Sequence, residues 1–439
     1  MTYSNTYSSP SSPTNFIPFS GMGMRKGGRA TMMPSNYQGD GSTLDLDFTT
    51  GVWDSRLTFT RSTTATYINS SGYVTSAAIN APRFDYSPTN IGQPRGLLIE
   101  GQTTNLARRT DDFNTVVTDG SQWVSSGYTV GTLSTQLPDG STGNARRISI
   151  ASGSGAFFSQ QITVTASTEY TFSFWARNNG GSQARYRVWN ATAASSIVDA
   201  TLPGSNYVSL IGGANNTSST WVRISVTFTT PVGCTAIIIY PTSTTSGSVD
   251  VLVWGAQLEL GSGASSYIPT GASQVTRAVD TAIIAAGTNF SSWYTGGTTG
   301  TFVTEWCRCS PTTTQRTVIA TSDVSNQHLH QYIAATTSRL RLADKVPAFI
   351  ETANASVDNS INKGAFSYSG SVQSLCLNGG TVVPGTLTFT TAPTWLSIGG
   401  PSTNGTSITD TAVVLNNAIR KIKYFPARLS DAQIKEITT

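Results

Sequence analysis

Six consecutive residues with the sequence RYRVWN combine side chains that suit sugar binding with the alternation of a β-strand. Successive side chains of a strand point to opposite faces, so Arg185, Arg187 and Trp189 share one face. A pyranose ring has an apolar face that stacks on Trp or Tyr, while its hydroxyl groups pair with Arg and amide side chains. If Val188 points into a core, we expect the other three residues to form a solvent-facing platform for a glycan.

Two more aromatic residues, Trp123 and Tyr207, lie in predicted loops and are further glycan-binding candidates. Aromatic side chains also fill the cores of β-sandwiches, and they bury large apolar areas there. Trp175, Trp221 and Trp254 stand in dense apolar strands, so we expect these three to be core residues.

Catalytic and metal-binding patterns are not found in the sequence. The only histidines, His328 and His330, lie two apart, which suits a polar strand face or a metal site repeated around a symmetry axis. We favour the polar face, because no acidic or Cys partner has zinc-ligand spacing. The 23 acidic residues are scattered, and the adjacent Asp111 and Asp112 would point to opposite faces of a strand. We therefore predict no enzyme, no catalytic residue, no metal site and no cofactor.

The composition predicts an all-β protein. Charged residues make up 11% of the 439 residues, against about 25% in an ordinary soluble domain. Ser, Thr, Asn and Gly take the polar positions, and Thr, Val, Ile, Tyr and Trp favour strands. The net charge of +4 is spread along the chain, with no aromatic residues among its basic clusters, so we expect no nucleic-acid partner. Neither a standard signal sequence nor an apolar run of about 20 residues is found, and we expect no membrane insertion.

Short alternating strands separated by Gly, Ser, Asn and Pro turns indicate β-sandwich domains. We predict an extended N-terminal arm, a small β-adaptor, a jelly roll, a linker and a second sandwich that ends in a helix. The predicted ranges are 1–43 for the arm, 44–104 for the adaptor, 105–272 for the jelly roll, 273–299 for the linker and 300–439 for the second sandwich. Ser430 and Gln433 have capping-box spacing for the C-terminal helix. The polar arm should be disordered alone, so we expect it to dock onto a neighbouring subunit or a larger particle.

Two smaller predictions concern the closing strand of the jelly roll and the thiols. In VLVWGAQLEL, regular alternation places Trp254 and Leu258 on an apolar face and Val251 and Val253 on the opposite face. The four cysteines have no zinc or disulfide-scaffold spacing, so we expect buried or half-buried free thiols, with Cys307 and Cys309 sharing one strand face.

Three parts of the chain resemble modules of bacteriophage structural proteins. Leu57–Leu106, with LTFTRSTTATY, APRFDY and RGLLIEGQTTNL, resembles a module of tail-fibre-like and head-spike-like chains. The segments YTFSFWAR, WVRISVTFT, VWGAQLELG, SYIPT and VTRAVD resemble carbohydrate-binding-module-like jelly rolls. The region from TFVTEWCR to IRKIKYFPARLSDAQIKEIT resembles a concanavalin/laminin-G-like sandwich.

This resemblance implies a virion protein, made in the host cytoplasm and anchored to other virion proteins through its N-terminal arm. The sandwiches of such a fibre or spike would adhere to host-surface polysaccharide, and phage fibres suggest a homotrimer. Many carbohydrate-module sandwiches carry a structural Ca²⁺ ion, so the resemblance is compatible with such an ion in this chain. Two alternatives remain: a capsid-decorating or baseplate protein whose sandwiches contact protein, and a glycan depolymerase.

Overall fold

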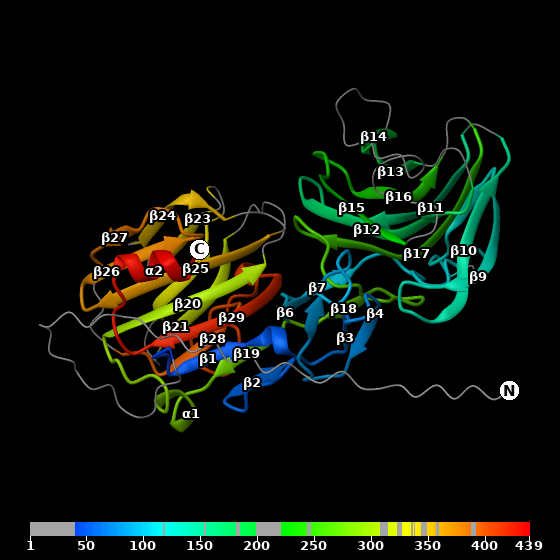
Figure 1. Ribbon diagram of the computed structural model, residues 1–439. Coiled ribbons are helices and arrows are strands. Elements are labelled where there is room, and N and C mark those ends of the chain that lie inside the picture. The colour runs from blue at the N-terminus through cyan, green and yellow to red at the C-terminus, as the bar shows by residue number, and fades with distance from the viewer. Residues whose placement is uncertain are drawn as a thin grey trace, which may run out of the picture. The chain divides into compact units, whose positions relative to one another are not determined.

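The computed structural model confirms the predicted all-β class with β-sandwich domains (Figure 1). It describes residues 40–116, 119–152, 155–180, 185–198, 221–243, 247–307, 315–322, 327–334, 337, 339–343, 349–356, 360–387 and 392–439. The predicted arm up to residue 39, and with it any docking of the arm, lies outside this range. Within the described chain, no helix has the length and apolar character that crossing a membrane would require.

One sandwich combines the C-terminal strands with strands from the N-terminal part of the chain. Its first sheet has the order β27-β26-β25-β20-β29-β6-β5, and β1 also pairs with β29. These strands are β1 (Leu44–Asp47), β5 (Phe84–Tyr86), β6 (Pro94–Ile99), β20 (Thr299–Cys307), β25 (Ile361–Ser369), β26 (Val372–Leu377), β27 (Val383–Gly385) and β29 (Asn417–Phe425). The second sheet consists of β2 (Leu57–Thr60), β19 (Thr281–Ile284), β28 (Trp395–Ile398), β21 (Arg316–Ser322), β22 (Gln327–Ile333), β23 (Arg339–Ala343) and β24 (Phe349–Ala355).

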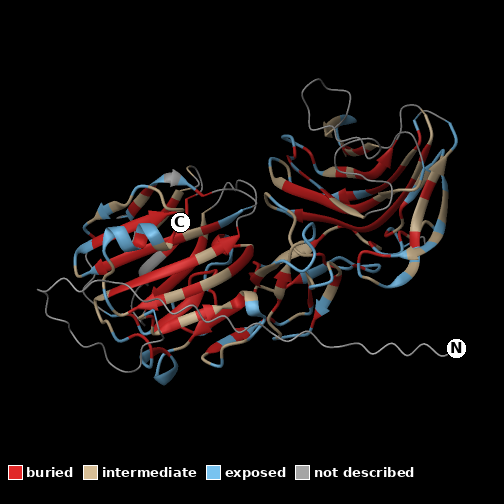
Figure 2. Cartoon of the chain, viewed as in Figure 1, coloured by how far each residue is buried: buried red, intermediate tan, exposed pale blue. Residues whose placement is uncertain are grey.

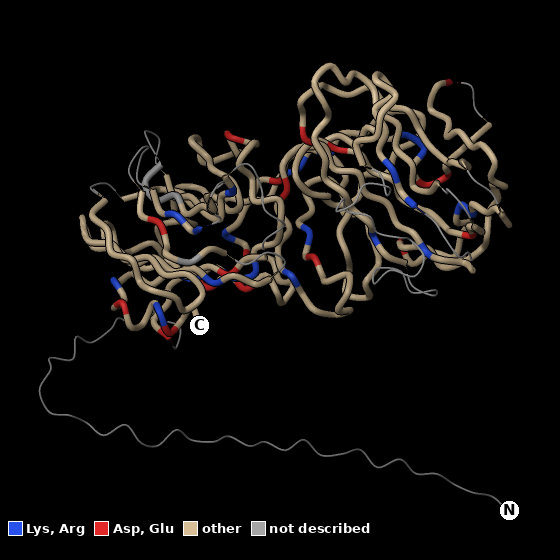
Figure 3. The backbone as a smooth tube through the Cα atoms, turned by 90° about the horizontal axis from the view of Figure 1, so that it is seen from above, with Lys and Arg blue, Asp and Glu red and all other residues tan. Residues whose placement is uncertain are grey.

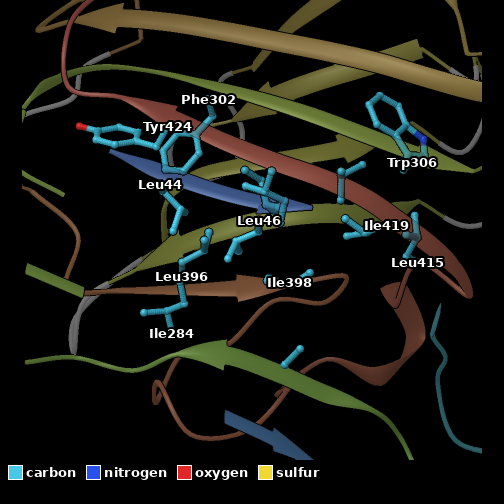
Figure 4. Close-up of a cluster of buried hydrophobic side chains, with 14 of the residues drawn as sticks. Leu44, Leu46, Ile284, Phe302, Trp306, Leu396, Ile398, Leu415, Ile419 and Tyr424 are labelled. Carbon is cyan, nitrogen blue, oxygen red and sulfur yellow. The ribbon is translucent and has the colours of Figure 1, made fainter. Parts of the chain in front are cut away.

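The N-terminal strands β1, β2 and β6 are integral to this sandwich. Strands β1 and β6 pair with β29, and β2 pairs with β19. Leu44 and Leu46 of β1 are buried in the same apolar cluster as Ile419 and Leu396, as Figure 4 shows. The predicted adaptor therefore does not form a core of its own: most of its strands complete the C-terminal sandwich, because they are too few to bury an apolar face alone.

The jelly roll forms a second sandwich of two five-stranded sheets. One sheet has the order β15 (Val222–Thr229), β12 (Glu169–Asn178), β17 (Val249–Leu260), β10 (Thr142–Ile150) and β9 (Thr129–Gln136). The other has the order β14 (Ser195–Val198), β13 (Arg185–Asn190), β16 (Ala236–Ser243), β11 (Phe157–Thr163) and β8 (Val124–Ser126). Inward-facing Phe, Ile and Val side chains from both sheets form one buried core (Figure 2).

A two-stranded ribbon marks where the chain enters and leaves the jelly roll. Strand β7 (Thr103–Asn105) pairs antiparallel with β18 (Val275–Arg277). The jelly roll is thus inserted between β6 and β19 of the other sandwich. The predicted linker contains β18, β19 and the short helix α1 (Thr288–Ser291), so it is part of that sandwich. The remaining small elements are the β3 (Ala65–Ile68) and β4 (Val74–Ala77) hairpin and two 3-10 turns, η1 (Phe48–Thr50) and η2 (Thr411–Val413).

The predicted C-terminal helix is confirmed as α2 (Asp431–Ile437). Ser430 accepts a hydrogen bond from the Gln433 backbone N–H, and the Gln433 side chain accepts from the Ser430 N–H, which completes the capping box. Its buried Ile434 packs with Cys376 and Phe425 on one face of the first sheet. Cys234, Cys307 and Cys376 are buried free thiols, as expected, whereas Cys309 lies outside the described residues.

A β-bulge at Gly255 changes the facing of the closing strand β17. The register between β12 and β17 shifts between Ser173 and Trp175, and Gly255 has a φ of +64°. Before the bulge, Val251 and Val253 face the sandwich core. The expected regular alternation had placed these two residues on the face opposite to Trp254 and Leu258. After the bulge, Leu258 faces that core, while Trp254 lies in a separate cluster on the other side of the sheet. The extra residue resets the two-residue period, which alternation alone does not reveal.

Candidate functional site

The outer face of the sheet that contains β13 carries the residues singled out in the sequence. Val188 is fully buried in the jelly-roll core, and Tyr186 beside it is buried as well. Arg185, Arg187 and Trp189 point the opposite way and are half-buried. The prediction that these three share a solvent-facing side is therefore confirmed, because the inward position of Val188 sets the alternation of the strand.

Arg187 lies between two aromatic rings on this face. Its guanidinium carbon is 4.7 Å from the centroid of the Trp189 ring and 5.4 Å from that of Tyr240. Tyr240 is directly opposite Arg187 on β16 and makes an edge contact with Phe157 of β11 at 6.0 Å between centroids. A guanidinium close to two rings is ordered by cation–π attraction. Trp189 is half-buried, whereas Tyr240 is only 8% exposed. We call Arg185, Arg187, Trp189, Tyr240 and Phe157 the outer face.

Tyr240 and Phe157 were not among the residues proposed from the sequence. Ile237 and Ile239 of β16 are buried in the core, so Tyr240 must face outward with Ile238. The same alternation argument that identified Trp189 would have identified Tyr240. The pairing of β16 with β13 is what brings Tyr240 to Arg187, and no local pattern contains that pairing. Burial raises the pKa of Tyr240, while the charge of Arg187 opposes this shift.

Trp123 is a core residue, and its prediction as a loop-placed glycan ligand was wrong. The side chain is fully buried and stacks on Phe158, with centroids 5.3 Å apart and planes at 12°. Its indole N–H donates to the Arg108 carbonyl at 2.9 Å, so the ring can be buried without an unpaired donor. The segment before β8 contributes Phe113 and Trp123 to the jelly-roll core, which a loop prediction does not include. Tyr207 lies outside the described residues.

The three tryptophans expected in the core divide into two groups. Trp175 and Trp254 are buried, with ring centroids 5.2 Å apart, and both contact Tyr267 from the SYIPT segment. They lie on the outer side of the β12–β17 sheet, where Val74 of β4 belongs to the same cluster. Trp221 is only half-buried there, and its indole N–H donates to the Gln136 carbonyl at 2.8 Å.

A second group of functional-looking residues comes from the FTR, APRF, LLIE and TRAVD motifs and is entirely buried. Arg61, Arg83, Glu100, Arg277 and Asp280, which we call the buried cluster, have side chains at most 3% exposed. Asp280 pairs with Arg61 at 3.1 Å and with Arg83. Glu100 pairs with Arg83 at 2.7 Å and with Arg277 at 3.0 Å.

The buried cluster also holds the exit of the jelly roll. The Ser266 backbone N–H and hydroxyl donate to Glu100 at 2.7 and 2.6 Å, and Arg277 donates to the Gly101 carbonyl at 2.7 Å. Segments that enter and leave the inserted domain are therefore joined through one set of charges. Because Glu100 and Asp280 are enclosed and fully paired, they suit a structural clamp and not general acid–base chemistry.

The electrostatics of the buried cluster favour its charged form. Burial by itself would raise the pKa of Glu100, but the charges of Arg277 and Arg83 and the bonds from Ser266 lower it to about 2. Burial would likewise lower the pKa of Arg83, but Asp280 and Glu100 raise it above its usual value. For Glu100 and Arg83 the attraction thus outweighs desolvation, whereas burial lowers the pKa of Arg61 despite its pairing with Asp280.

Other carboxylates in and around the jelly roll have structural partners. Asp250 accepts two bonds from Arg147, at 2.8 and 2.6 Å. Glu259 is buried and accepts from Ser265 and Gln257, and burial raises its pKa. Asp111 accepts a hydrogen bond from Tyr267. Among the residues that the structure describes, no three His, Cys, Asp or Glu side chains gather as a metal site, and the His328 and His330 side chains are outside that set. Charged side chains are sparse along the described chain (Figure 3).

One comparison with known proteins identifies a family for the jelly roll. A family model described as "Carbohydrate binding domain" matches residues 109–247, which supports carbohydrate binding by this domain. No curated protein matches the chain.

Similar solved structures are distant. The CBM40 domain of the Ruminococcus gnavus IT-sialidase bound to α2,3-sialyllactose is 16% identical, with 33% of this chain and 84% of that chain covered and a TM-score of 0.27. Domain 4 of a GH43 extracellular arabinanase from Geobacillus stearothermophilus, in complex with arabinotriose, is 13% identical over 40% and 82%, with a TM-score of 0.28. A Trypanosoma rangeli sialidase is 13% identical over 36% and 26%, with a TM-score of 0.29, so the match spans about a quarter of that enzyme.

Proposed function

We propose that the chain is a non-enzymatic adhesion protein that binds bacterial surface glycans through the outer face of its jelly roll. The observation that carries this proposal is the position of Arg187 between Trp189 and Tyr240 on a solvent-facing sheet. That sheet belongs to the part of the chain matched by the carbohydrate-binding family model. Rings of this kind stack on the apolar face of a sugar, and the guanidinium donates to its hydroxyl groups.

A binding role fits this face better than hydrolysis. Glycoside hydrolysis generally needs two carboxyl groups about 5–9.5 Å apart. The sequences of β8, β11, β13, β14 and β16 contain no Asp or Glu. A glycan depolymerase is the alternative function. Measurable shortening of a polysaccharide by the protein would favour it.

The setting that we propose is a bacteriophage particle, with the chain as a fibre or spike anchored by its N-terminal arm. The support for this setting is the resemblance of Leu57–Leu106 to a recurring module of phage structural proteins. Display in several copies, as a trimer by analogy with phage fibres, would offset weak binding at each site. A capsid-decorating or baseplate protein is the alternative, and antibody labelling of intact particles distinguishes these positions.

The binding proposal is tested with a Trp189→Ala variant of the full chain on an array of bacterial surface polysaccharides. We expect at least a tenfold loss of affinity for the glycans that the unmodified chain binds, equivalent to about 1.4 kcal/mol. Phe349→Ala is the matched control, because Phe349 is an exposed aromatic residue of the other sandwich and also carries a stacked arginine, Arg341. Equal binding by a folded Trp189→Ala variant and the unmodified chain would remove the outer face from the proposal.

A further inference from the structure

A cavity of about 640 Å³ opens beside the β7–β18 ribbon. Its walls come from four parts of the chain. These are the segment that enters the jelly roll, the segment 259–265 that leaves it, the residues 274–277 around β18, and Arg316, Leu415 and Asn416 of the other sandwich. No residue of the outer face lines this cavity. Its volume is within the range of about 300–1,000 Å³ that is typical of small-ligand sites.

The lining is rich in neutral hydrogen-bonding groups. Hydroxyl and amide side chains around it are those of Gln102, Thr103, Thr104, Ser265, Gln274 and Thr276. The hydroxyls of Thr104 and Thr276 lie 2.7 Å apart on the ribbon. Leu106, Leu260 and Leu415 add apolar surface, and Leu260 is 59% exposed even though it is a large aliphatic residue. This mixture of hydroxyl, amide and aliphatic groups matches a polyhydroxylated ring, which has polar edges and apolar C–H faces.

Three charged side chains line the cavity, and one of them, Arg316, donates to the Val414 carbonyl at 3.1 Å. Arg277 pairs with Glu100 at 3.0 Å, and Glu259 accepts hydrogen bonds from Ser265 and Gln257. The Arg277 side chain is 1% exposed, and its Nε has no hydrogen-bond acceptor among the described residues. This enclosed Nε does not face the solvent in the cavity. Because the positive charge of Arg277 is already paired, a neutral hydroxyl group suits this lining better than a second carboxylate.

We propose that this cavity is a second, independent sugar site, which takes a neutral sugar unit. The hydroxyl groups of the sugar would pair with the Thr104–Thr276 pair and with the amides around it, and Leu260 would cover a C–H face. None of the lining residues is aromatic, so we expect binding in the millimolar range, about −4 kcal/mol. A sugar bound here would touch both the ends of the inserted jelly roll and the sandwich that holds it.

The test is binding of neutral trisaccharides to the full chain, measured by saturation-transfer NMR. The probes are cellotriose, maltotriose and arabinotriose, with trigalacturonic acid as the acidic comparison. We expect at least one neutral probe to bind more tightly than the acid. The double variant Thr104→Val with Thr276→Val keeps the β-branched shape and removes both hydroxyls, and it should weaken that probe at least fivefold.

A second variant blocks the cavity sterically. A side chain at Gly263 meets open space at its Cβ, so Gly263→Phe should fold and fill the cavity. Phe349→Ala is the control and should leave trisaccharide binding unchanged, because the exposed Phe349 lies neither in this cavity nor on the outer face. The proposal is overturned if no neutral trisaccharide binds, or if both cavity variants bind like the unmodified chain. It is equally overturned if Trp189→Ala alone abolishes binding.

Discussion

The buried cluster and the outer face are both built around arginines, yet their surroundings give these arginines different tasks. In the buried cluster, three arginines meet two carboxylates with side chains at most 3% exposed. On the outer face, Arg187 lies against two aromatic rings and remains half-buried. Enclosed charges must be paired, so the first group stabilises the fold. A partly exposed cation on aromatic rings keeps a surface that a ligand can contact.

The same comparison assigns a structural role to four recognisable sequence motifs. FTR, APRF, LLIE and TRAVD contain Arg61, Arg83, Glu100, Arg277 and Asp280. These residues meet in one buried cluster and close the base of the inserted domain. The most recognisable residues of the chain therefore describe how a jelly roll is attached, while the ligand face lies in a less distinctive strand.

The largest expected effect is on the buried cluster. Asp280→Asn removes the carboxylate partner of Arg61 and one of the two partners of Arg83, which leaves an excess of positive charge buried. We expect the free energy of unfolding to fall by about 3–5 kcal/mol, as measured by urea denaturation. Asp54→Asn is the control, since Asp54 pairs with Arg56 where both side chains are about a quarter exposed, and about 1 kcal/mol or less is expected there. Similar losses for the two variants would contradict the clamp.

The free energy of unfolding should also depend on pH through the buried cluster, with a somewhat smaller effect than that of Asp280→Asn. The pKa of Glu100 is about 2 in the folded protein, against an ordinary value of 4.5. The stabilisation is therefore complete above pH 4.5 and is lost as the pH falls toward 2. It is at most about 3 kcal/mol. Urea denaturation at several pH values would measure it, and Glu100→Gln should flatten this acid-side slope. An unchanged slope in that variant would exclude Glu100 as its source.

The bulge in β17 should be sensitive to a single methyl group. Gly255 has a φ of +64°, and a Cβ there would lie 2.8 Å from Trp175 Cε3. We expect Gly255→Ala to lower the free energy of unfolding by about 2 kcal/mol, through backbone strain and overpacking. Thermal unfolding followed by tryptophan fluorescence measures this loss of stability directly. Gly263→Ala, where a Cβ meets nothing within 4 Å, should change stability little. Equal stability of both variants would mean that the bulge relaxes.

The smallest effect on stability is expected on the outer face. Trp189→Ala removes one ring from Arg187 and should cost about 1 kcal/mol of unfolding free energy or less. Its glycan affinity should nevertheless fall at least tenfold. Denaturation and glycan binding measured on the same preparation give both values. A large loss of stability with unchanged binding would reverse the roles assigned to the two regions.

Alternation and composition determined much of this protein before any tertiary contact. They gave the all-β class, the jelly-roll strands, the capped helix at Ser430 and the shared face of Arg185, Arg187 and Trp189. Each of these depends on properties of neighbouring residues, such as a two-residue period or a three-residue capping spacing. The aromatic candidate in a loop was misassigned, because the segment before β8 contributes Trp123 to the jelly-roll core.

Only the tertiary structure decided which distant segments meet. Strand β1 is paired with β29 across most of the chain length, so the jelly roll became an insertion and not the second domain in a row. Tyr240 reached Arg187 through the pairing of β16 with β13, and the motif residues met in the buried cluster through packing around the β7–β18 ribbon. A sequence displays local period and residue type. Which strands form hydrogen bonds with each other depends on the simultaneous burial of both sheets. No single segment of the sequence contains this information.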